Sequence, residues 1–230
     1  MSIVVRGQQS SDLKLWFNQP SGDTWENALP IGNGRIGAMV YGNVPKEIFQ
    51  LNEHTVWSGS PNRNDNPNAF EALPKVRQLI FDGEYKAAEQ MANDKIMSKK
   101  SQGQMFQPVG NLELTFPDHE NFENYYRDLD ISNATSKTSY SVNGVNYNRE
   151  AFVSLTDRVL IIKLSADQPG KISFTANFNS PHLDPKIEIQ EDNQISLWGK
   201  TSDHEGIEGK VEFNALMRMK IDNGSITKID

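Results

Sequence analysis

Residues 25–42 read WENALPIGNGRIGAMVYG, and residues 50–59 read QLNEHTVWSG. The first segment holds glycines at positions 32, 34, 37 and 42, which alternate with apolar residues. Glycine is typical of backbone that turns with a positive φ or lies close against another group. The pattern predicts two short strands over residues 31–42, joined and bounded by glycine turns.

Polar and aromatic side chains gather around this glycine-rich stretch. We interpret them as candidates for the rim of a sugar pocket or for a surface that docks another domain: Trp25, Asn33, Arg35, Asn52, Glu53, His54 and Trp57. Aromatic planes pack well on the C–H faces of sugar rings, but core packing is the commoner role of tryptophan. A single histidine beside a tryptophan is likewise more often a hydrogen-bonded structural residue than a catalytic base.

Catalytic chemistry finds little support in the residue pattern. Glycoside hydrolysis commonly uses two carboxyl groups, and Glu26, Glu53 and Asp65 are the candidates near the glycine-rich stretch. Nothing in the sequence brings two of them together, so holding loops and strand ends is the favoured role. A Gly-x-Ser-x-Gly nucleophile motif and a phosphate-binding loop are both missing from the sequence. We therefore assign no catalytic residue.

Charge and composition exclude several classes of ligand. The chain has 230 residues, a formal net charge of −7 and no cysteine, and its pI is about 5.2. An acidic chain is a poor match for nucleic acid or for an anionic membrane. The four histidines include no pair at i, i+4 spacing, so we expect neither a metal site nor a cofactor. No apolar run approaches the roughly 20 residues of a membrane span.

Residues 1–11 lack the apolar core of a signal peptide and are predicted to form a disordered leader.

A helical hairpin is predicted over about residues 70–98. Pro74 suits a first helical position, and Asp82-Gly83 is typical of a helix end. A second helix then follows from about Glu84, with apolar residues at three- and four-residue spacing. The polar loop of residues 58–68 precedes the hairpin, and loops of this kind often lie near a functional or partner surface.

Period-two alternation dominates the rest of the chain and predicts antiparallel strands. Asn143-Gly144 between alternating segments is the strongest hairpin signal. Residues 159–164 are apolar on both faces and are predicted to form a central strand, whereas residues 211–221 form the longest alternation. The last turn, Asn223-Gly224, is followed by only six residues. We predict a mainly β fold, a large antiparallel β super-sandwich over residues 12–230 that is truncated before its last strands.

Several motifs together resemble one family of enzymes. They are residues 28–39 (ALPIGNGRIGAM), residues 51–59 (LNEHTVWSG), the helical segment with Pro74 and Arg77, residues 149–154 (REAFVS) and residues 157–159 (DRV). This set is similar to the N-terminal domain of glycoside hydrolase family 95, the inverting α-L-fucosidases, some of which prefer L-galactosides. His54 departs from the pattern, because many family members have Asp at that position.

The resemblance implies a β super-sandwich that precedes an α/α toroid in a longer, multidomain chain. In the family the catalytic residues belong to the toroid, and no position here matches them. The resemblance therefore implies a non-catalytic N-terminal domain of an enzyme that removes terminal α-L-fucose from fucosylated glycans, with the toroid as its partner. A stand-alone carbohydrate-binding β-sandwich module and L-galactosidase specificity in the full enzyme are the alternatives. An enzyme of this kind is expected to be exported to the periplasm or the extracellular space, and a bacterial source is expected. Sequence alone leaves the glycan linkage and the oligomeric state open.

Overall fold

The computed structural model describes residues 13–98, 103–191 and 193–229. The disordered leader predicted over residues 1–11 lies outside this part. The chain divides into two compact units, which are described separately. The first comprises the chain up to Val56, Gln107–Lys200 and the residues from Glu212 onward; the second comprises Trp57–Phe106 and Thr201–Val211.

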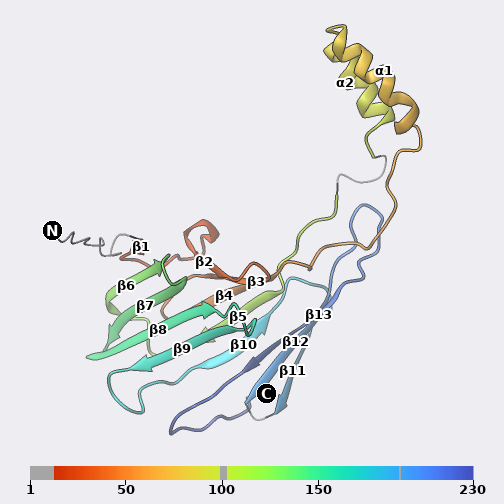
Figure 1. Cartoon of the computed structure of the whole chain (residues 1–230). Coiled ribbons are helices and arrows are strands. Elements are labelled where there is room, and N and C mark those ends of the chain that lie inside the picture. Colours follow the sequence, from red (N-terminus) through yellow and green to blue (C-terminus); the bar gives the residue numbers. More distant parts are fainter. Residues whose placement is uncertain (1–12, 99–102, 192, 230) are drawn as a thin grey trace, which may run out of the picture. The chain divides into compact units, whose positions relative to one another are not determined.

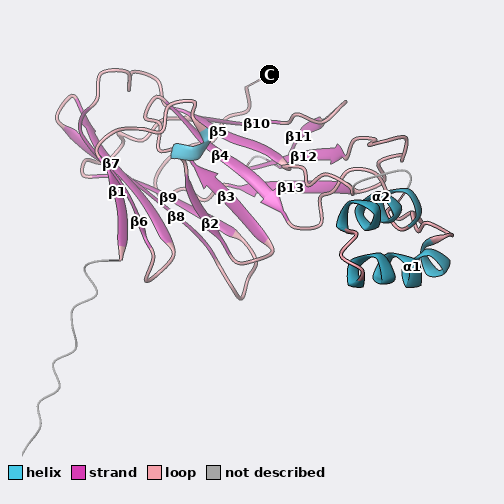
Figure 2. Ribbon diagram, turned by 90° about the horizontal axis from the view of Figure 1, so that it is seen from above, coloured by secondary structure: helices cyan, strands magenta, loops and turns pink. Residues whose placement is uncertain are grey.

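The first unit consists of antiparallel sheets, whose strands Figures 1 and 2 show. The first sheet has the order β1 (Lys14–Phe17), β6 (Glu123–Asp130), β7 (Thr135–Val142), β8 (Val145–Val153) and β9 (Leu160–Ala166). The second has the order β10 (Thr175–Asn179), β5 (Gly110–Thr115), β4 (Lys46–Glu53), β3 (Ile36–Val40) and β2 (Leu29–Gly32). The third contains β11 (Lys186–Glu191), β12 (Gln194–Lys200) and β13 (Glu212–Arg218). The predicted mainly β, antiparallel sandwich is confirmed.

The larger of two apolar clusters in this unit joins its three sheets. Phe49, Leu112 and Phe178 come from the second sheet, Leu129 and Val153 come from the first, and all five are buried in the same cluster. The third sheet adds two further buried side chains to it, Ile195 and Leu197. Within the strands that supply it, the buried apolar residues lie at every second position, as on the buried face of a sheet. The opposite faces of the first two sheets are therefore free to carry polar side chains.

A buried polar network lies beside this core. Arg149 donates to the carbonyl oxygens of Asn43 (2.6 Å) and Val44 (2.6 Å), to Glu47 Oε2 (3.1 Å) and to the Tyr140 hydroxyl (2.7 Å). Glu47 is fully buried and also accepts from the backbone N–H of the β3–β4 connection. One side chain of the first sheet thus fixes a loop of the second sheet.

The second unit holds the α-hairpin (Figure 2), formed by α1 (Ala69–Phe81) and α2 (Tyr85–Lys95). The helices bury only Val76 and Ala88. Within the same unit, backbone hydrogen bonds join Gly59 to Ser202 (2.9 Å) and to Lys210 (3.0 Å). These bonds tie the segment that leads into the hairpin to residues 201–211.

Three details of the predicted strands and helices are wrong. Pro74 lies inside α1, because the helix already begins at Ala69. Residues 159–164 supply β9, which pairs only with β8 among the described strands and so lies at an edge. Its apolar outer side chain Ile161 is 39% exposed. Apolar residues on both faces therefore did not require the central position that was predicted from them. The alternation over residues 211–221 supplies β13, but the strand covers only Glu212–Arg218 and ends before the alternation does.

Candidate functional site

Asn33 organises the turn between β2 and β3. Its Oδ1 accepts hydrogen bonds from the backbone N–H of Arg35 and of Ile36, both at 3.0 Å. Its Nδ2 donates to the carbonyl oxygen of Ser154 at 2.9 Å, which lies in the connection between β8 and β9. Gly34 has a φ of +86° and gives the turn its left-handed residue. One amide side chain therefore closes the turn and links the two sheets at this end of the sandwich.

Glu53, at the end of β4, is held by its neighbours at the same end. It accepts from Arg35 Nε (3.0 Å) and from the backbone N–H of Thr55 (2.8 Å), and the Thr55 hydroxyl also donates to it. His54 Nδ1 lies 3.3 Å from its Oε1. Glu53 is paired with Ile36 across the strands, so the β2–β3 turn and the end of β4 meet.

The electrostatics of this cluster favour an ionised carboxylate. Burial is the largest single influence and would raise the pKa of Glu53, but the Thr55 hydrogen bonds and the His54 and Arg35 charges outweigh it. The pKa of Glu53 is therefore held below its usual range. An ionised carboxylate can accept a hydrogen bond from a ligand hydroxyl or from a donor on a docking surface, but it is a poor general acid at neutral pH.

Trp25 and Asn52 lie by the outer face of the second sheet. Trp25 belongs to the 3-10 turn Trp25–Asn27 and donates from Nε1 to Gln50 Oε1 at 2.7 Å. Asn52 follows Gln50 by two positions on β4, so both side chains share one face, and Asn52 Nδ2 lies 3.5 Å from the Gln50 carbonyl oxygen. The Trp25 residue is 51% exposed, and its indole edge is fixed by Gln50.

Trp57 belongs to the second unit. It forms an isolated β-bridge with Phe106, and the two rings meet edge to face with centroids 5.5 Å apart. Trp57 is 44% exposed. The structure thus brings Asn33, Arg35, Glu53 and His54 together, with Trp25 and Asn52 on the adjoining face.

The sequence interpretation missed the amides on the outer face of the second sheet. Gln50, Asn111, Asn177 and Asn179 lie on the same side of β4, β5 and β10. Their signal was present in the sequence as amides at alternate positions of a strand, as in Asn177-x-Asn179. It passed unnoticed because alternation was used to find the buried face and not to examine the opposite one.

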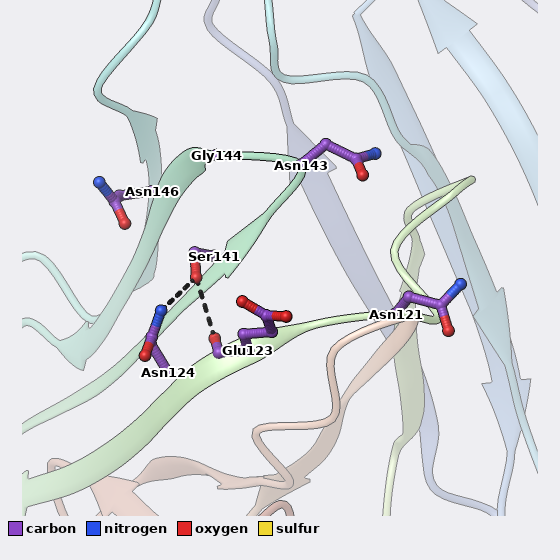
Figure 3. Close-up of a pocket in the computed structure, with 7 residues that line it drawn as sticks. All are labelled: Asn121, Glu123, Asn124, Ser141, Asn143, Gly144 and Asn146. Carbon is purple, nitrogen blue, oxygen red and sulfur yellow. Dashed lines mark hydrogen bonds between the residues drawn. The ribbon is translucent and has the colours of Figure 1, made fainter.

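A separate polar pocket lies at the β7–β8 turn and is shown in Figure 3. Its lining residues are Asn121, Glu123, Asn124, Ser141, Asn143, Gly144 and Asn146. Asn124 Nδ2 donates to Ser141 Oγ (2.8 Å), which in turn donates to the carbonyl oxygen of Glu123 (3.3 Å). Figure 3 shows the Asn121, Asn143 and Asn146 amides pointing in different directions rather than at one point. None of the residues proposed from the sequence lines this pocket.

The residues that the structure describes bear on metal binding and on membrane insertion. No three His, Asp or Glu side chains there gather in a way that could hold a metal ion. No helix in this part of the chain is long and apolar enough to cross a membrane. The two other carboxylates considered from the sequence are both exposed: Glu26 is in the 3-10 turn and Asp65 is in the second unit.

Comparison with known proteins extends these findings. The chain is 34% identical over 245 residues to alpha-L-fucosidase 2 of Arabidopsis thaliana, an alignment that covers 96% of this chain and 28% of the relative. It is 30% identical over 200 residues to probable alpha-fucosidase A of Aspergillus niger, with 81% of this chain and 24% of the relative covered. A similar match, at 27% identity, is found to probable alpha-fucosidase A of Aspergillus oryzae.

The chain thus spans about a quarter of the length of the curated relatives it matches, so those proteins contain much further sequence. These matches confirm the resemblance to the N-terminal domain of an α-L-fucosidase-like glycoside hydrolase. A family model described as "Glycosyl hydrolase family 65, N-terminal domain" matches residues 15–230. By that match, the chain belongs to the family of glycosyl hydrolase family 65 N-terminal domains.

Proposed function

We propose that this chain is the non-catalytic N-terminal domain of an inverting α-L-fucosidase that belongs to glycoside hydrolase family 95. The whole enzyme removes terminal α-L-fucose from fucosylated glycans without a metal, and its catalytic residues lie in a downstream α/α toroid. The observation that carries the proposal is the set of α-fucosidase relatives, which this chain matches over nearly its whole length but over only about a quarter of theirs. L-galactoside specificity is the alternative within the same reaction class.

The end of the second sheet is the surface that we assign to contact with the toroid. Asn33 and Glu53 are both fixed by hydrogen bonds to neighbours on the β2–β3 turn and β4. Arg35 uses only Nε for Glu53 among the described residues, and its side chain is 51% exposed. Polar groups held in place in this way suit a docking interface or the rim of a sugar pocket.

A comparison of two proteins tests where the chemistry lies. The 230-residue chain and the longer protein that contains it are assayed against an aryl α-L-fucoside and an aryl α-L-galactoside. We expect turnover of the fucoside by the longer protein alone. Turnover by the 230-residue chain would show that chemistry resides here, and a longer protein that cleaves neither fucoside nor galactoside would refute the proposed activity.

The role of the sheet end is tested in the same longer protein. Arg35→Ala removes an exposed guanidinium from the cluster, whereas Arg218→Ala removes an exposed one from β13. We expect Arg35→Ala to reduce kcat/KM about tenfold, as loss of one charge-assisted contact does. The control should stay within about twofold, and equal effects of the two substitutions would argue against a docking role.

Export and source complete the proposal. An enzyme that acts on glycans outside the cell is expected in the periplasm or the extracellular space, and fractionation of the native host tests this. A bacterial source is proposed from the sequence alone. The relatives reported above come from a plant and two fungi and lend it no support.

A further inference from the structure

We propose that the outer face of the second sheet binds a neutral glycan through Trp25 and a row of amide side chains. The register of the sheet builds this row from one residue of each strand. In order across the sheet it reads Pro30, Met39, Gln50, Asn111 and Asn179. Directly opposed side chains on neighbouring antiparallel strands have Cβ atoms about 5 Å apart, close to the spacing of hydroxyls across a pyranose ring. We call this set, with Trp25 and Asn177, the amide row.

The amide row has hydrogen-bonding groups to spare. Within the described residues, the side-chain amides of Asn111 and Asn177 have no protein partner. Gln50 uses its Oε1 for Trp25, which leaves its amino group as a donor, and Asn179 Nδ2 lies 3.4 Å from Glu113 Oε1. An amide offers both a donor and an acceptor, which matches the dual character of sugar hydroxyls. These groups face solvent on a sheet that holds their backbones rigid.

Trp25 supplies an aromatic surface beside these amides. The hydrogen bond from its Nε1 to Gln50 fixes the indole edge at the middle strand of the sheet, while 51% of the residue stays exposed. An aromatic ring that is held at one edge and open elsewhere loses little entropy when a sugar ring packs on it. Met39 and Pro30 continue the face with further C–H groups.

The outer face of the first sheet provides the contrast. There, charged side chains pair across the strands: Lys14 with Asp128 (3.7 Å), Lys137 with Glu150 (3.0 Å), and Lys163 with Glu150 (4.0 Å). Such a face satisfies its own charges and gains little from a neutral ligand. On the outer face of the second sheet, Lys46 pairs with Glu113 at 2.8 Å toward the start of β4, and the amide row itself is uncharged.

This chemistry identifies the class of ligand. A face with an open aromatic ring, several amides and no unpaired charge does not match nucleic acid or an anionic peptide, which need cationic partners. It matches an uncharged oligosaccharide. The surface stands independently of the proposed hydrolase activity; only the inclusion of a fucosylated probe rests on that proposal.

Titration of the 230-residue chain and of the longer protein tests the inference. The probes are maltohexaose, cellohexaose and an S-linked fucosyl-lactose that resists hydrolysis. Calorimetry and tryptophan fluorescence measure their binding. We expect at least one probe to bind both proteins with a Kd on the order of 0.1–1 mM, the range of a few hydrogen bonds and one stacking contact. Trp25→Ala should weaken binding about tenfold or more, and Asn111→Ala about threefold to tenfold.

Matched controls come from the outer face of the first sheet. Trp16→Ala removes a tryptophan that is 61% exposed, and Asn148→Ala removes an exposed strand amide. Both should leave the Kd within about twofold. Asn111→Asp keeps the shape of the side chain, so it reports on hydrogen bonding if the alanine variant folds poorly; it should also weaken binding.

Three results would overturn the inference: no probe binds, the control variants lose as much affinity as the amide-row variants, or binding is confined to the 230-residue chain. The last result would show that further protein covers this face. Hydrolysis of an aryl fucoside by the longer protein is measured separately, so the proposed activity and this surface can fail independently.

Discussion

At the scale of single residues, stability depends on the buried pair of Glu47 and Arg149. The two side chains are 1% and 4% exposed, and their charged atoms lie 3.1 Å apart. Arg149→Met would leave a buried carboxylate without its cation, which costs about 3–5 kcal/mol. Glu47→Gln combined with Arg149→Met should cost less free energy of unfolding than the sum of the single substitutions, because each single variant leaves one buried group without its partner.

Urea unfolding of the three variants measures these differences in the free energy of unfolding. The exposed pair of Lys137 and Glu150 is the control, and Lys137→Ala should cost at most about 1 kcal/mol. Additive losses at positions 47 and 149 would show that the two groups do not act as a pair.

The second residue-scale prediction concerns Glu53 and pH. Its pKa is lower in the folded protein than the value of about 4.3 in an unfolded chain. The folded state therefore binds fewer protons, so the stabilisation is complete above that value and is lost as the pH falls through the folded pKa. Glu53→Gln should lower the free energy of unfolding by about 1 kcal/mol at pH 7, and the difference from wild type should shrink as the pH falls below about 4 and through the folded pKa of Glu53.

Denaturant unfolding between pH 3 and pH 7 follows that difference. Glu212→Gln, an exposed residue of β13, is the control and should show no such pH-dependent difference. A Glu53→Gln effect that persists unchanged at pH 3 would mean that side-chain shape rather than charge matters.

At the scale of elements, local signals located strands better than they located neighbours. Asn143 and Gly144, with φ of 49° and 76°, form the predicted hairpin turn, because such a turn needs these residues whatever surrounds it. In contrast, the sequence pattern did not predict β6, because Arg127 and Asp128 are buried there although they are charged. Arg127 donates to the carbonyl oxygens of Gln19 and Asn27, about 100 residues away in sequence. Periodicity cannot reveal partners of that kind.

The candidate site likewise contains residues that local signals predict and residues whose role depends on strand pairing. Asn33 and Glu53 were found because turn residues and polar clusters leave local signals. The role of Gln50 and Asn111 depends on strand register, which brings β4 and β5 together across the inserted hairpin. Register is set by the whole core, so the amide row could only be seen once the sheet was assembled.

The connection between β3 and β4 offers an element-scale prediction. Gly42 has a φ of +67°, and a Cβ there would lie 2.7 Å from the Tyr125 hydroxyl and 2.8 Å from Arg127 Cδ. Gly42→Ala should therefore destabilise the protein by about 2–4 kcal/mol through backbone strain and displaced side chains. Gly22 has a similar φ of +64° but open space around it, so Gly22→Ala should cost only about 1 kcal/mol. Thermal unfolding compares the two, and equal losses would indicate that strain alone acts.

At the scale of the whole molecule, the net charge of −7 opposes association, whereas β9, an edge strand of the first sheet that pairs only with β8 among the described strands, favours it. Phe152 and Ile161 are paired across β8 and β9 and are 40% and 39% exposed, so an apolar pair lies next to an unpaired strand edge. Such edges pair with other chains unless a charge blocks them.

Ile161→Lys should therefore reduce self-association of the 230-residue chain, about tenfold in the association constant, at neutral pH. The net charge argues for the opposite result, because the substitution brings it from −7 toward zero and weakens repulsion. Sedimentation velocity over a range of concentrations separates the two effects. Lys163→Ile is the reciprocal control, since it removes a charge from the outer face of β9 and should increase association. If Ile161→Lys associates more strongly than wild type, net charge rather than the β9 edge governs self-association of this chain.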